Sequence, residues 1–393
     1  MSCFLKRTWA EVDADCIAFN YHAIRNYIHE GCKFMAIVKA DAYGHGAPFV
    51  AGEFEALGAD YFGVSNMEEA LQLRNSGIKK PILILGYTPS EYAGEMISKN
   101  ITQTVLDLQY AKELSKAAQS AGGTLKTHIK IDTGMSRIGF LYHDAENNSG
   151  SVNEILEVSS LPALDLEGIF THFAVSDEPE KGFTKIQFAR FMDIIEKLSQ
   201  KGLNFRLRHC CNSAGLLNFP EMQLDMVRPG IILYGMTPSE GMPLPIELKP
   251  TMALKTVISQ VKTLAGGTAI SYGMKYVTDG EKRVATLPVG YADGFARCLS
   301  NRADVLICGK RARIIGRVCM DQCMIDVSEI DEAAENKVVT VIGRDGGDTV
   351  SMEEIAGFMG TINYETACLI GKRVPRVFYK DGKIVGTQNY ILP

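Results

Sequence analysis

The sequence has 393 residues, of which 46% are hydrophobic and 22% are charged, and its formal net charge is −5. This length favours two domains, although a barrel alone can reach about 250 residues. The small negative charge argues against a surface that binds nucleic acid or an anionic membrane. The first residues carry no long apolar run, and no stretch of about 18 apolar residues occurs, so we expect a cytoplasmic protein without a secretion signal or membrane-spanning helix.

The first two-thirds of the chain alternates short apolar runs with amphipathic segments. One helix is predicted after Asn66, an N-cap type residue, and stops at Gly77, and another spans 183–201 and is closed by Gly202. Several runs are apolar on both faces, which is typical of a buried parallel sheet. The predicted strands of this part are 33–39, 60–65, 81–85, 103–106, 126–131, 166–170, 204–209 and 224–227.

Such β-then-α units, about eight within about 240 residues, are what a TIM barrel needs. We therefore predict an α/β protein whose residues 1–244 form an N-terminal (β/α)8 TIM barrel. A doubly wound open sheet stays open as the alternative, because element counts from a single sequence carry errors.

The pattern of predicted secondary structure changes near residue 245. Beyond it, short β-rich runs are separated by Gly, Asp and Asn turns, and long helices are few. We predict a C-terminal, mostly β domain over residues 245–393, with which the first ten or so residues of the chain could pair. Its predicted strands are 251–263, 283–287, 304–307, 311–315, 324–326 and 337–342.

The ten cysteines are scattered and include the adjacent pair Cys210 and Cys211, which is unlike the spacing of a secreted disulfide scaffold. Cys319 and Cys323 lie four residues apart, but no second pair or nearby histidine completes a zinc set. We expect reduced thiols and no metal site.

The string AIVKADAYGHG at residues 36–46 places Lys39 at the carboxyl end of the first predicted barrel strand, where barrel active sites lie. Alone, this lysine could be a strand-end side chain that reaches solvent. The string, however, closely resembles the pyridoxal-phosphate attachment motif of the alanine racemase family. Further strings match the family in order: IDTGMSRIG at 131–139, THFA at 171–174, CNSAG at 211–215, VRPGIILYG at 227–235, AISYG at 269–273, GYADG at 290–294, GRVCMDQ at 316–322 and INYE at 362–365.

The resemblance implies a homodimeric, pyridoxal-phosphate-dependent racemase that interconverts L- and D-alanine for peptidoglycan synthesis, with active sites shared between subunits. Racemisation removes the Cα proton on one face and returns a proton on the other, so it needs an electron sink, which the cofactor supplies, and in the simplest scheme two bases. By resemblance Lys39 binds the cofactor and, once released, acts as one base. Tyr272 of the partner subunit matches the other base, and His172 matches the basic neighbour that a tyrosine, with an ordinary pKa of about 10, requires. Taken alone, Tyr272 could be an ordinary strand aromatic.

Arg228 matches the family's partner of the cofactor's pyridine nitrogen. An arginine keeps its proton, so the ring nitrogen would stay unprotonated, which weakens the electron sink and limits side reactions such as transamination. The phosphate is expected at the ends of the last barrel strands, where backbone N–H groups bind it in many barrels. The further residues that the resemblance implies for cofactor binding are Tyr43, His172, Asn212, Ser213, Gly230, Ile231 and Tyr364.

Arg137 and the backbone of Met320 match the contacts to the substrate carboxylate, and an arginine fork suits a carboxylate. Lys130 matches a position that is carbamylated in some family members, which would place an anion opposite Arg137. The residues matching the lining of the substrate pocket and its entrance are Asp321, Tyr291, Asp177, Arg297 and Arg317, the last three of which could equally be solvated charges. Two departures are small: Ser136 stands where many relatives have Gly or Asn, and Cys211 where many have Ala.

Three alternatives stay open. A racemase of the same fold acting on serine or on many amino acids would use the same catalytic residues, and pocket size would decide. A related barrel decarboxylase would carry an acidic residue at the position of Arg228 and lack the Tyr272 string. A cofactor-carrying protein without turnover would resemble the barrel alone, whereas this chain continues into a long β-rich part.

Overall fold

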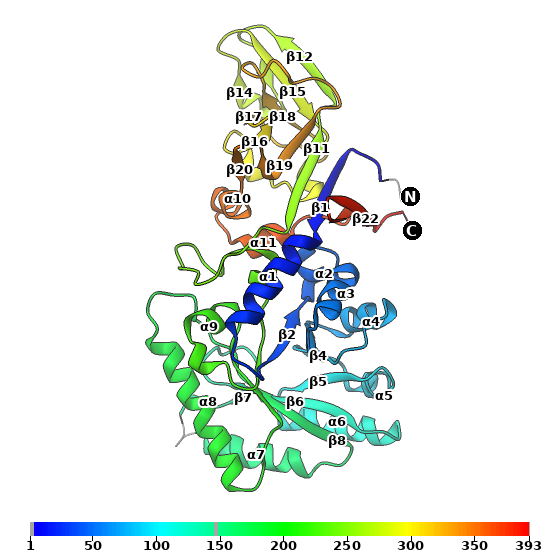
Figure 1. Ribbon diagram of the computed structural model, residues 1–393, viewed down its shortest axis with the longest axis vertical. Coiled ribbons are helices and arrows are strands. Elements are labelled where there is room, and N and C mark those ends of the chain that lie inside the picture. The colour runs from blue at the N-terminus through cyan, green and yellow to red at the C-terminus, as the bar shows by residue number, and fades with distance from the viewer. Residues whose placement is uncertain (1–3, 145–147, 393) are drawn as a thin grey trace.

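The computed structural model describes residues 4–144 and 148–392, which form a barrel and a second, β-rich part stacked along the long axis of the molecule (Figure 1). Eight parallel strands build the barrel, in the order β10-β2-β3-β4-β5-β6-β8-β9. Their bounds are β2 (Lys33–Ile37), β3 (Tyr61–Val64), β4 (Ile82–Ile84), β5 (Ile101–Val105), β6 (Leu125–Asp132), β8 (Leu164–Phe170), β9 (Leu207–His209) and β10 (Met226–Val227). A short strand, β7 (Phe140–Leu141), pairs with β6 outside this order.

Two backbone hydrogen bonds join the last pair of strands and nearly close the barrel. Asp225 N–H donates to the Arg208 carbonyl at 3.1 Å, and Arg228 N–H donates to the Cys211 carbonyl at 3.0 Å. The predicted TIM barrel is therefore confirmed, and the doubly wound open sheet is excluded. Each of the eight predicted runs overlaps a barrel strand, and these strands are largely buried because helices cover the outside of a parallel barrel.

Helix α1 precedes the first barrel strand, and the other helices of the barrel follow its strands (Figure 1). Asn66 caps one of them, since its Oδ1 accepts the Glu69 N–H at 3.0 Å, so the predicted helix start is confirmed, and the predicted helix at 183–201 corresponds to α8. The helices are α1 (Ala14–Tyr27), α2 (Lys39–Gly44), α3 (Ala47–Leu57), α4 (Met67–Asn75), α5 (Ala93–Ser98), α6 (Leu108–Ser120), α7 (Ser149–Ser160), α8 (Gly182–Gln200) and α9 (Ser213–Asn218).

The second part is built on an 11-stranded sheet, which confirms a mostly β fold beyond the barrel. Its order is β12-β15-β18-β17-β16-β19-β11-β1-β21-β22, and β20 pairs with β19. The bounds are β1 (Thr8–Asp13), β11 (Met252–Val257), β12 (Gln260–Leu264), β15 (Lys282–Leu287), β16 (Asp304–Ile307), β17 (Lys310–Ile315), β18 (Cys323–Asp326), β19 (Val338–Asp345), β20 (Asp348–Val350), β21 (Arg376–Lys380) and β22 (Lys383–Gln388). A separate hairpin joins β13 (Ala269–Ile270) and β14 (Tyr276–Val277), and two helices, α10 (Met352–Met359) and α11 (Asn363–Cys368), complete this part.

The prediction of one strand over 251–263 is wrong, because the chain changes partners in the middle of the run. β11 pairs with β1 and β19, whereas β12 pairs with β15 near the other end of the sheet. Between them the Ile258 N–H donates to the Lys337 carbonyl and the Ser259 N–H to the Thr286 carbonyl, both at 2.9 Å. A change of pairing partner leaves no local mark on an alternating sequence.

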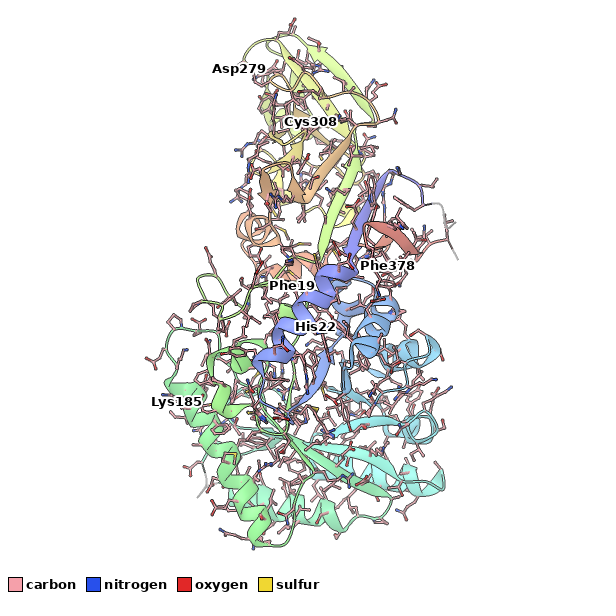
Figure 2. All side chains as sticks on the ribbon, viewed as in Figure 1. Phe19, His22, Lys185, Asp279, Cys308 and Phe378 are labelled. Atoms are coloured by element: carbon pink, nitrogen blue, oxygen red, sulfur yellow. The ribbon has the colours of Figure 1, made fainter. Side chains whose placement is uncertain are left out.

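The N-terminal strand β1 belongs to the second sheet, although the rest of its half of the chain forms the barrel. It pairs antiparallel with β11 and parallel with β21. At the junction, marked by Phe378 in Figure 2, the ring of Phe378 on β21 stacks on Phe49 of α3 with centroids 4.0 Å apart. The two parts therefore meet through strand pairing and direct packing.

Candidate active site

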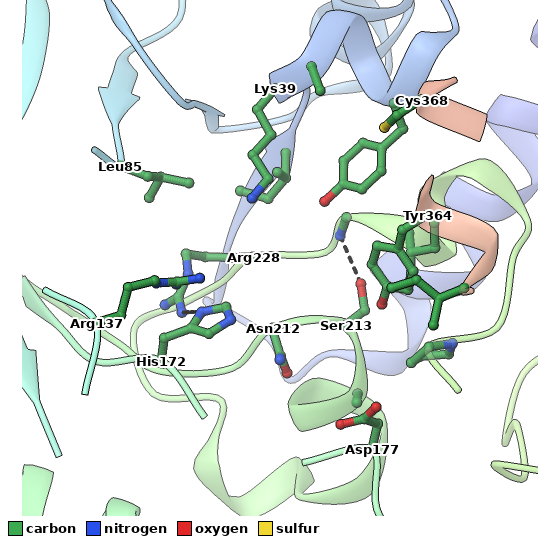
Figure 3. Close-up of a pocket in the computed structure, with 18 of the residues that line it drawn as sticks. Lys39, Leu85, Arg137, His172, Asp177, Asn212, Ser213, Arg228, Tyr364 and Cys368 are labelled. Carbon is green, nitrogen blue, oxygen red and sulfur yellow. Dashed lines mark hydrogen bonds between the residues drawn. The ribbon is translucent and has the colours of Figure 1, made fainter. Parts of the chain in front are cut away.

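A cavity of about 490 Å³ opens at the carboxyl ends of the barrel strands and is covered by α11. Most of the predicted site residues line it (Figure 3). Those that the structure brings together there are Lys39, Tyr43, Lys130, Arg137, His172, Asp177, Asn212, Ser213, Arg228, Gly230, Ile231 and Tyr364.

Lys39 lies just beyond the strand that was predicted to contain it. β2 ends at Ile37, and residues 40–43 then form a left-handed turn with φ between +52° and +56°. Glu69 of α4 supports this turn, because one carboxylate oxygen accepts the Ala40 N–H and the other accepts the Ser65 N–H, each at 2.7 Å. The turn directs the Lys39 amine into the cavity toward Arg228 (Figure 3).

The environment of Lys39 favours its neutral amine. Burial lowers the pKa of the Lys39 amine, and the positive charge of Arg137 lowers it further, while Glu69 acts in the opposite direction. A neutral amine is the form that attacks a carbonyl carbon or accepts a proton, so the direction of this shift suits a nucleophile or a base.

Arg228 is the buried cation of the site, and acceptors surround its guanidinium. Nη1 lies 2.9 Å from His209 Nδ1, and Nη2 donates to the carbonyls of Thr171 at 2.9 Å and Cys210 at 3.1 Å. Nη2 also lies 3.3 Å from His172 Nδ1. Burial lowers the pKa of Arg228 to about 10, so it still carries its charge at neutral pH.

His172 is held neutral by this cationic surrounding. Burial, and then the charges of Arg228, Lys130 and Arg137, lower the pKa of His172 well below its ordinary value. With Nδ1 facing the Arg228 donor, the second ring nitrogen carries the proton. His172 therefore presents a neutral imidazole to the cavity.

Arg137 enters the cavity from a loop that one carboxylate organises. Asp132 Oδ1 accepts the N–H groups of Gly134, Met135 and Ser136 at 2.9 to 3.0 Å, and its Oδ2 accepts the Arg137 N–H at 3.0 Å. Ser136 adopts a φ of +56° in this loop. The position is one where glycine or asparagine avoids backbone strain, so serine here carries a conformational cost.

Lys130 lies on β6 beside this loop and is almost fully buried. Its Nζ donates to the Ile131 carbonyl at 2.7 Å. Burial, followed by the charge of Arg228, lowers the pKa of Lys130 to about 7. A substantial fraction of this lysine is therefore uncharged at neutral pH.

Hydrogen-bond donors gather on the side of the cavity opposite Arg137, at the ends of β9 and β10 (Figure 3). The Gly230 N–H donates to Ser213 Oγ at 2.9 Å, and a Cβ at Gly230 would lie 2.7 Å from the Tyr43 hydroxyl, so the close approach needs glycine. Burial raises the pKa of the Tyr43 and Tyr364 hydroxyls, which keeps both protonated as donors. Asn212 has a structural role as the N-cap of α9, since its Oδ1 accepts the Gly215 N–H at 2.8 Å. The hydroxyl and backbone donors suit an anionic ligand.

The remaining predicted residues lie in the second part and do not reach this cavity within one chain. Tyr272, Met320 and Asp321 line a separate groove, and the Tyr272 side chain is 71% exposed. Tyr291 N–H donates to the Cys319 carbonyl at 3.1 Å, which places it beside that groove. The two arginines of this set are Arg317, next to Gly273, and Arg297, the first residue of the short helix η6 (Arg297–Leu299).

A row of buried, hydrogen-bonded polar side chains lies behind Arg228, and it was not predicted from the sequence. His209 Nε2 lies 2.8 Å from His128 Nδ1, and His128 Nε2 lies 3.4 Å from Glu167. Because Arg228 donates to His209 Nδ1, the proton of His209 lies on Nε2 and is donated to His128 Nδ1. His128 in turn donates from Nε2 to Glu167. The sequence carries no clear signal for this row, because these residues stand among other polar residues in β6 (LKTHIKID), β8 (LDLEGIF) and β9 (LRH).

The described residues 4–144 and 148–392 contain no cluster of three or more potential metal ligands and no helix long and apolar enough to cross a membrane. The nine cysteines within these ranges are free thiols. Burial raises the pKa of the Cys32 thiol to about 12 and that of Cys16 to about 11.

Both parts of the structure match sequence models of known protein domains. The sequence model of the alanine racemase N-terminal domain matches residues 12–238, and that of the alanine racemase C-terminal domain matches residues 251–378. An alanine racemase of Desulfovibrio desulfuricans is 46% identical over 378 residues, which cover 96% of this chain and 100% of the relative.

Solved structures agree with these sequence matches. An alanine racemase of Clostridium difficile 630 has a TM-score of 0.93 and 41% identity, covering 98% of this chain and 99% of its own. A histidine racemase of Leuconostoc mesenteroides has a TM-score of 0.88 and 29% identity, covering 96% of this chain and 99% of its own.

The left-handed serine of the Arg137 loop leads to a stability prediction. Ser136→Gly should raise the free energy of unfolding by about 0.5–1 kcal/mol, because glycine adopts positive φ without a Cβ clash. Urea unfolding of purified protein measures the change. As a control, Ser120→Gly at the exposed last residue of helix α6 should lower stability by about 0.5 kcal/mol. Equal losses for both variants would show that Ser136 is not strained.

Proposed function

This chain belongs to the alanine racemase family and is an amino-acid racemase, and on that premise we propose that it interconverts L- and D-alanine using pyridoxal phosphate and two bases. The observation that carries the proposal is the convergence of Lys39, the buried Arg228 and a set of anion-binding donors in one cavity. We further propose that the enzyme works in the cytoplasm and supplies D-alanine for peptidoglycan. We also propose that the boundary between its two domains lies between residues 244 and 245.

The residues of the cavity fit pyridoxal phosphate. The neutral amine of Lys39 would bind its aldehyde carbon, and Arg228 would donate to its pyridine nitrogen. The phosphate would lie against Tyr43, Ser213, the N–H groups of Gly230 and Ile231, and Tyr364, with Asn212 and His172 completing the walls. When bound, the cofactor supplies an electron sink for the carbanion at Cα.

Arg228 would tune this sink through its charge. Because it keeps its proton at neutral pH, it can donate to the ring nitrogen but has no acceptor to offer. The ring nitrogen then stays unprotonated, and reprotonation at Cα is favoured over competing reactions.

Lys39 and Tyr272 would act on opposite faces of Cα. The Lys39 amine lies in the cavity and can take or return a proton there. The Tyr272 hydroxyl is exposed on the second part of the same chain, so we propose that it enters the cavity of a second copy, next to His172. Tyr272 and Met320, both exposed, line one groove, and covering that groove with a second copy supports a homodimer.

The substrate carboxylate would be held by Arg137 of one copy and by the backbone N–H of Met320 from the other. A carbamate on Lys130 would carry a negative charge beside Arg137 and keep its guanidinium in place. The residues proposed to line the pocket and its entrance are Asp321, Tyr291, Asp177, Arg297 and Arg317.

The reaction and its substrate can be tested by proton NMR in deuterium oxide with pyridoxal phosphate. L-alanine should lose its Cα proton signal and yield D-alanine by chiral analysis, whereas Lys39→Ala should lower this rate by at least about 10³-fold, because both the attachment point and a base are removed. L-serine and L-histidine serve as alternative substrates. Faster exchange with either would keep the mechanism and replace alanine as the substrate.

Shared active sites predict complementation between two inactive variants. Lys39→Ala and Tyr272→Phe should each be inactive alone, and refolding them as a mixture should restore up to about one quarter of the wild-type activity, because half of the chains form heterodimers with one intact site. Activity of the refolded mixture, compared with each variant refolded alone, is the measurement. A mixture as inactive as its components would contradict a site built from two subunits.

Carbamylation of Lys130 should depend on pH around 7. Below that value the lysine carries its proton and does not react, and above it the neutral amine can attack carbon dioxide, whereas an ordinary lysine would require a pH above about 10. Protein equilibrated with ¹³C-labelled bicarbonate should show a carbamate carbon signal by NMR that grows between pH 6 and pH 8. Lys130→Met is the control, and a signal unchanged in this variant would assign the carbamate elsewhere.

A further inference from the structure

The left-handed turn after Lys39 is held from behind by the end of the chain. Helix α11 packs directly on it, since a Cβ at Gly44 would lie 2.5 Å from the Ala367 carbonyl oxygen. Beyond α11, two further side chains reach the same place, Arg376 from β21 and Tyr390 from the segment after β22. Neither of these side chains lines the cavity.

Arg376 is a buried cation that joins the turn to the loop after α11. Its Nε donates to the Gly44 carbonyl at 2.8 Å, at the end of the turn. Nη2 donates to the Ile370 carbonyl at 2.7 Å, and Nη1 donates to the carbonyls of Gly371 at 2.8 Å and Val374 at 2.6 Å. Since these four bonds fix the guanidinium, the turn is tied to the segment that places α11 over the cavity.

Tyr390 holds the middle of the turn through Asp41. Its hydroxyl donates to Asp41 Oδ2, while Oδ1 of the same carboxylate accepts the Ala47 N–H at 2.8 Å. The ring of Tyr390 also lies 5.2 Å from the Arg376 guanidinium carbon, a cation–π distance. The two tail residues and Asp41 thus form one connected group.

We infer that the C-terminal segment, through Arg376 and Tyr390, is the positioning element for the amine of Lys39. Residues 40–43 occupy a backbone region that L-residues disfavour, so the turn needs outside contacts to persist. The tail supplies contacts at Asp41 and Gly44, on the side of the turn away from the cavity. This inference rests on the proposed function, because it takes Lys39 as the residue that binds the cofactor.

Tyr390→Phe tests the inference, since it removes one hydroxyl and keeps the packed ring. Hydrogen–deuterium exchange of the full-length holoenzyme should be at least about fivefold faster in the peptide covering residues 39–47, because a hydrogen bond to a charged group is lost. The kcat for alanine should fall at least about fivefold while KM stays within about twofold, since Arg137 and Met320 are untouched. The thermal midpoint should match that of the matched control, Tyr379→Phe.

The control removes a tail hydroxyl that lies 3.5 Å from Glu11 and does not touch the turn. Asp41→Asn serves as a second variant, since it weakens the same bond from the other side and should reproduce the Tyr390→Phe results. If Tyr390→Phe and Tyr379→Phe give the same exchange and the same kcat, the inference is overturned. A wild-type protein without racemase activity would instead refute the proposed function, and the exchange measurement would still report on the turn.

Discussion

Four consecutive non-glycine residues in the left-handed region, at positions 40–43, are the constraint on which the site depends. Each such residue costs about 1–2 kcal/mol, so the turn cannot persist by itself. Its stabilising contacts come from Glu69 of α4, from α11 and from the C-terminal strands. Lys39 is therefore placed by segments that lie far apart in the sequence, and the barrel and the second part act as one structural unit around it.

Positive charge is the second property that organises the cavity. Its lining carries four basic side chains, Lys39, Lys130, Arg137 and Arg228, against two acidic ones, Asp177 and Glu365. Burial, followed by the repulsion of neighbouring positive charges, lowers the pKa of Lys39, Lys130 and His172. The charges of Arg137 and Arg228, which contribute to these shifts, would attract a phosphate or a carboxylate.

Much of the architecture was predictable from local patterns, because buried parallel strands read as apolar runs and Asn66 marks a helix start. The split between β11 and β12 was not, since pairing partners are set by distant residues. The left-handed turn was equally hidden, because Ala40, Ala42 and Tyr43 disfavour positive φ and a single tolerant residue, Asp41, does not reveal four in a row. For the site, the family resemblance identified the candidate residues in the sequence. The fold then shows which of them line the cavity around Lys39 and which lie in the exposed groove at Tyr272.

The placement of β1 in the second sheet has a consequence for biosynthesis. Thr8 lies against Thr256 across a separation of 248 residues, and Ala10 pairs with Arg376 near the end of the chain. At translation rates of about 5–20 residues per second, β1 waits roughly 10–50 seconds for its first partner after it is made. The barrel strands, which end at Val227, are complete before that partner exists. An unpaired strand is prone to wrong association, and the acidic side chains Glu11 and Asp13 give β1 a polar edge during this interval on the ribosome.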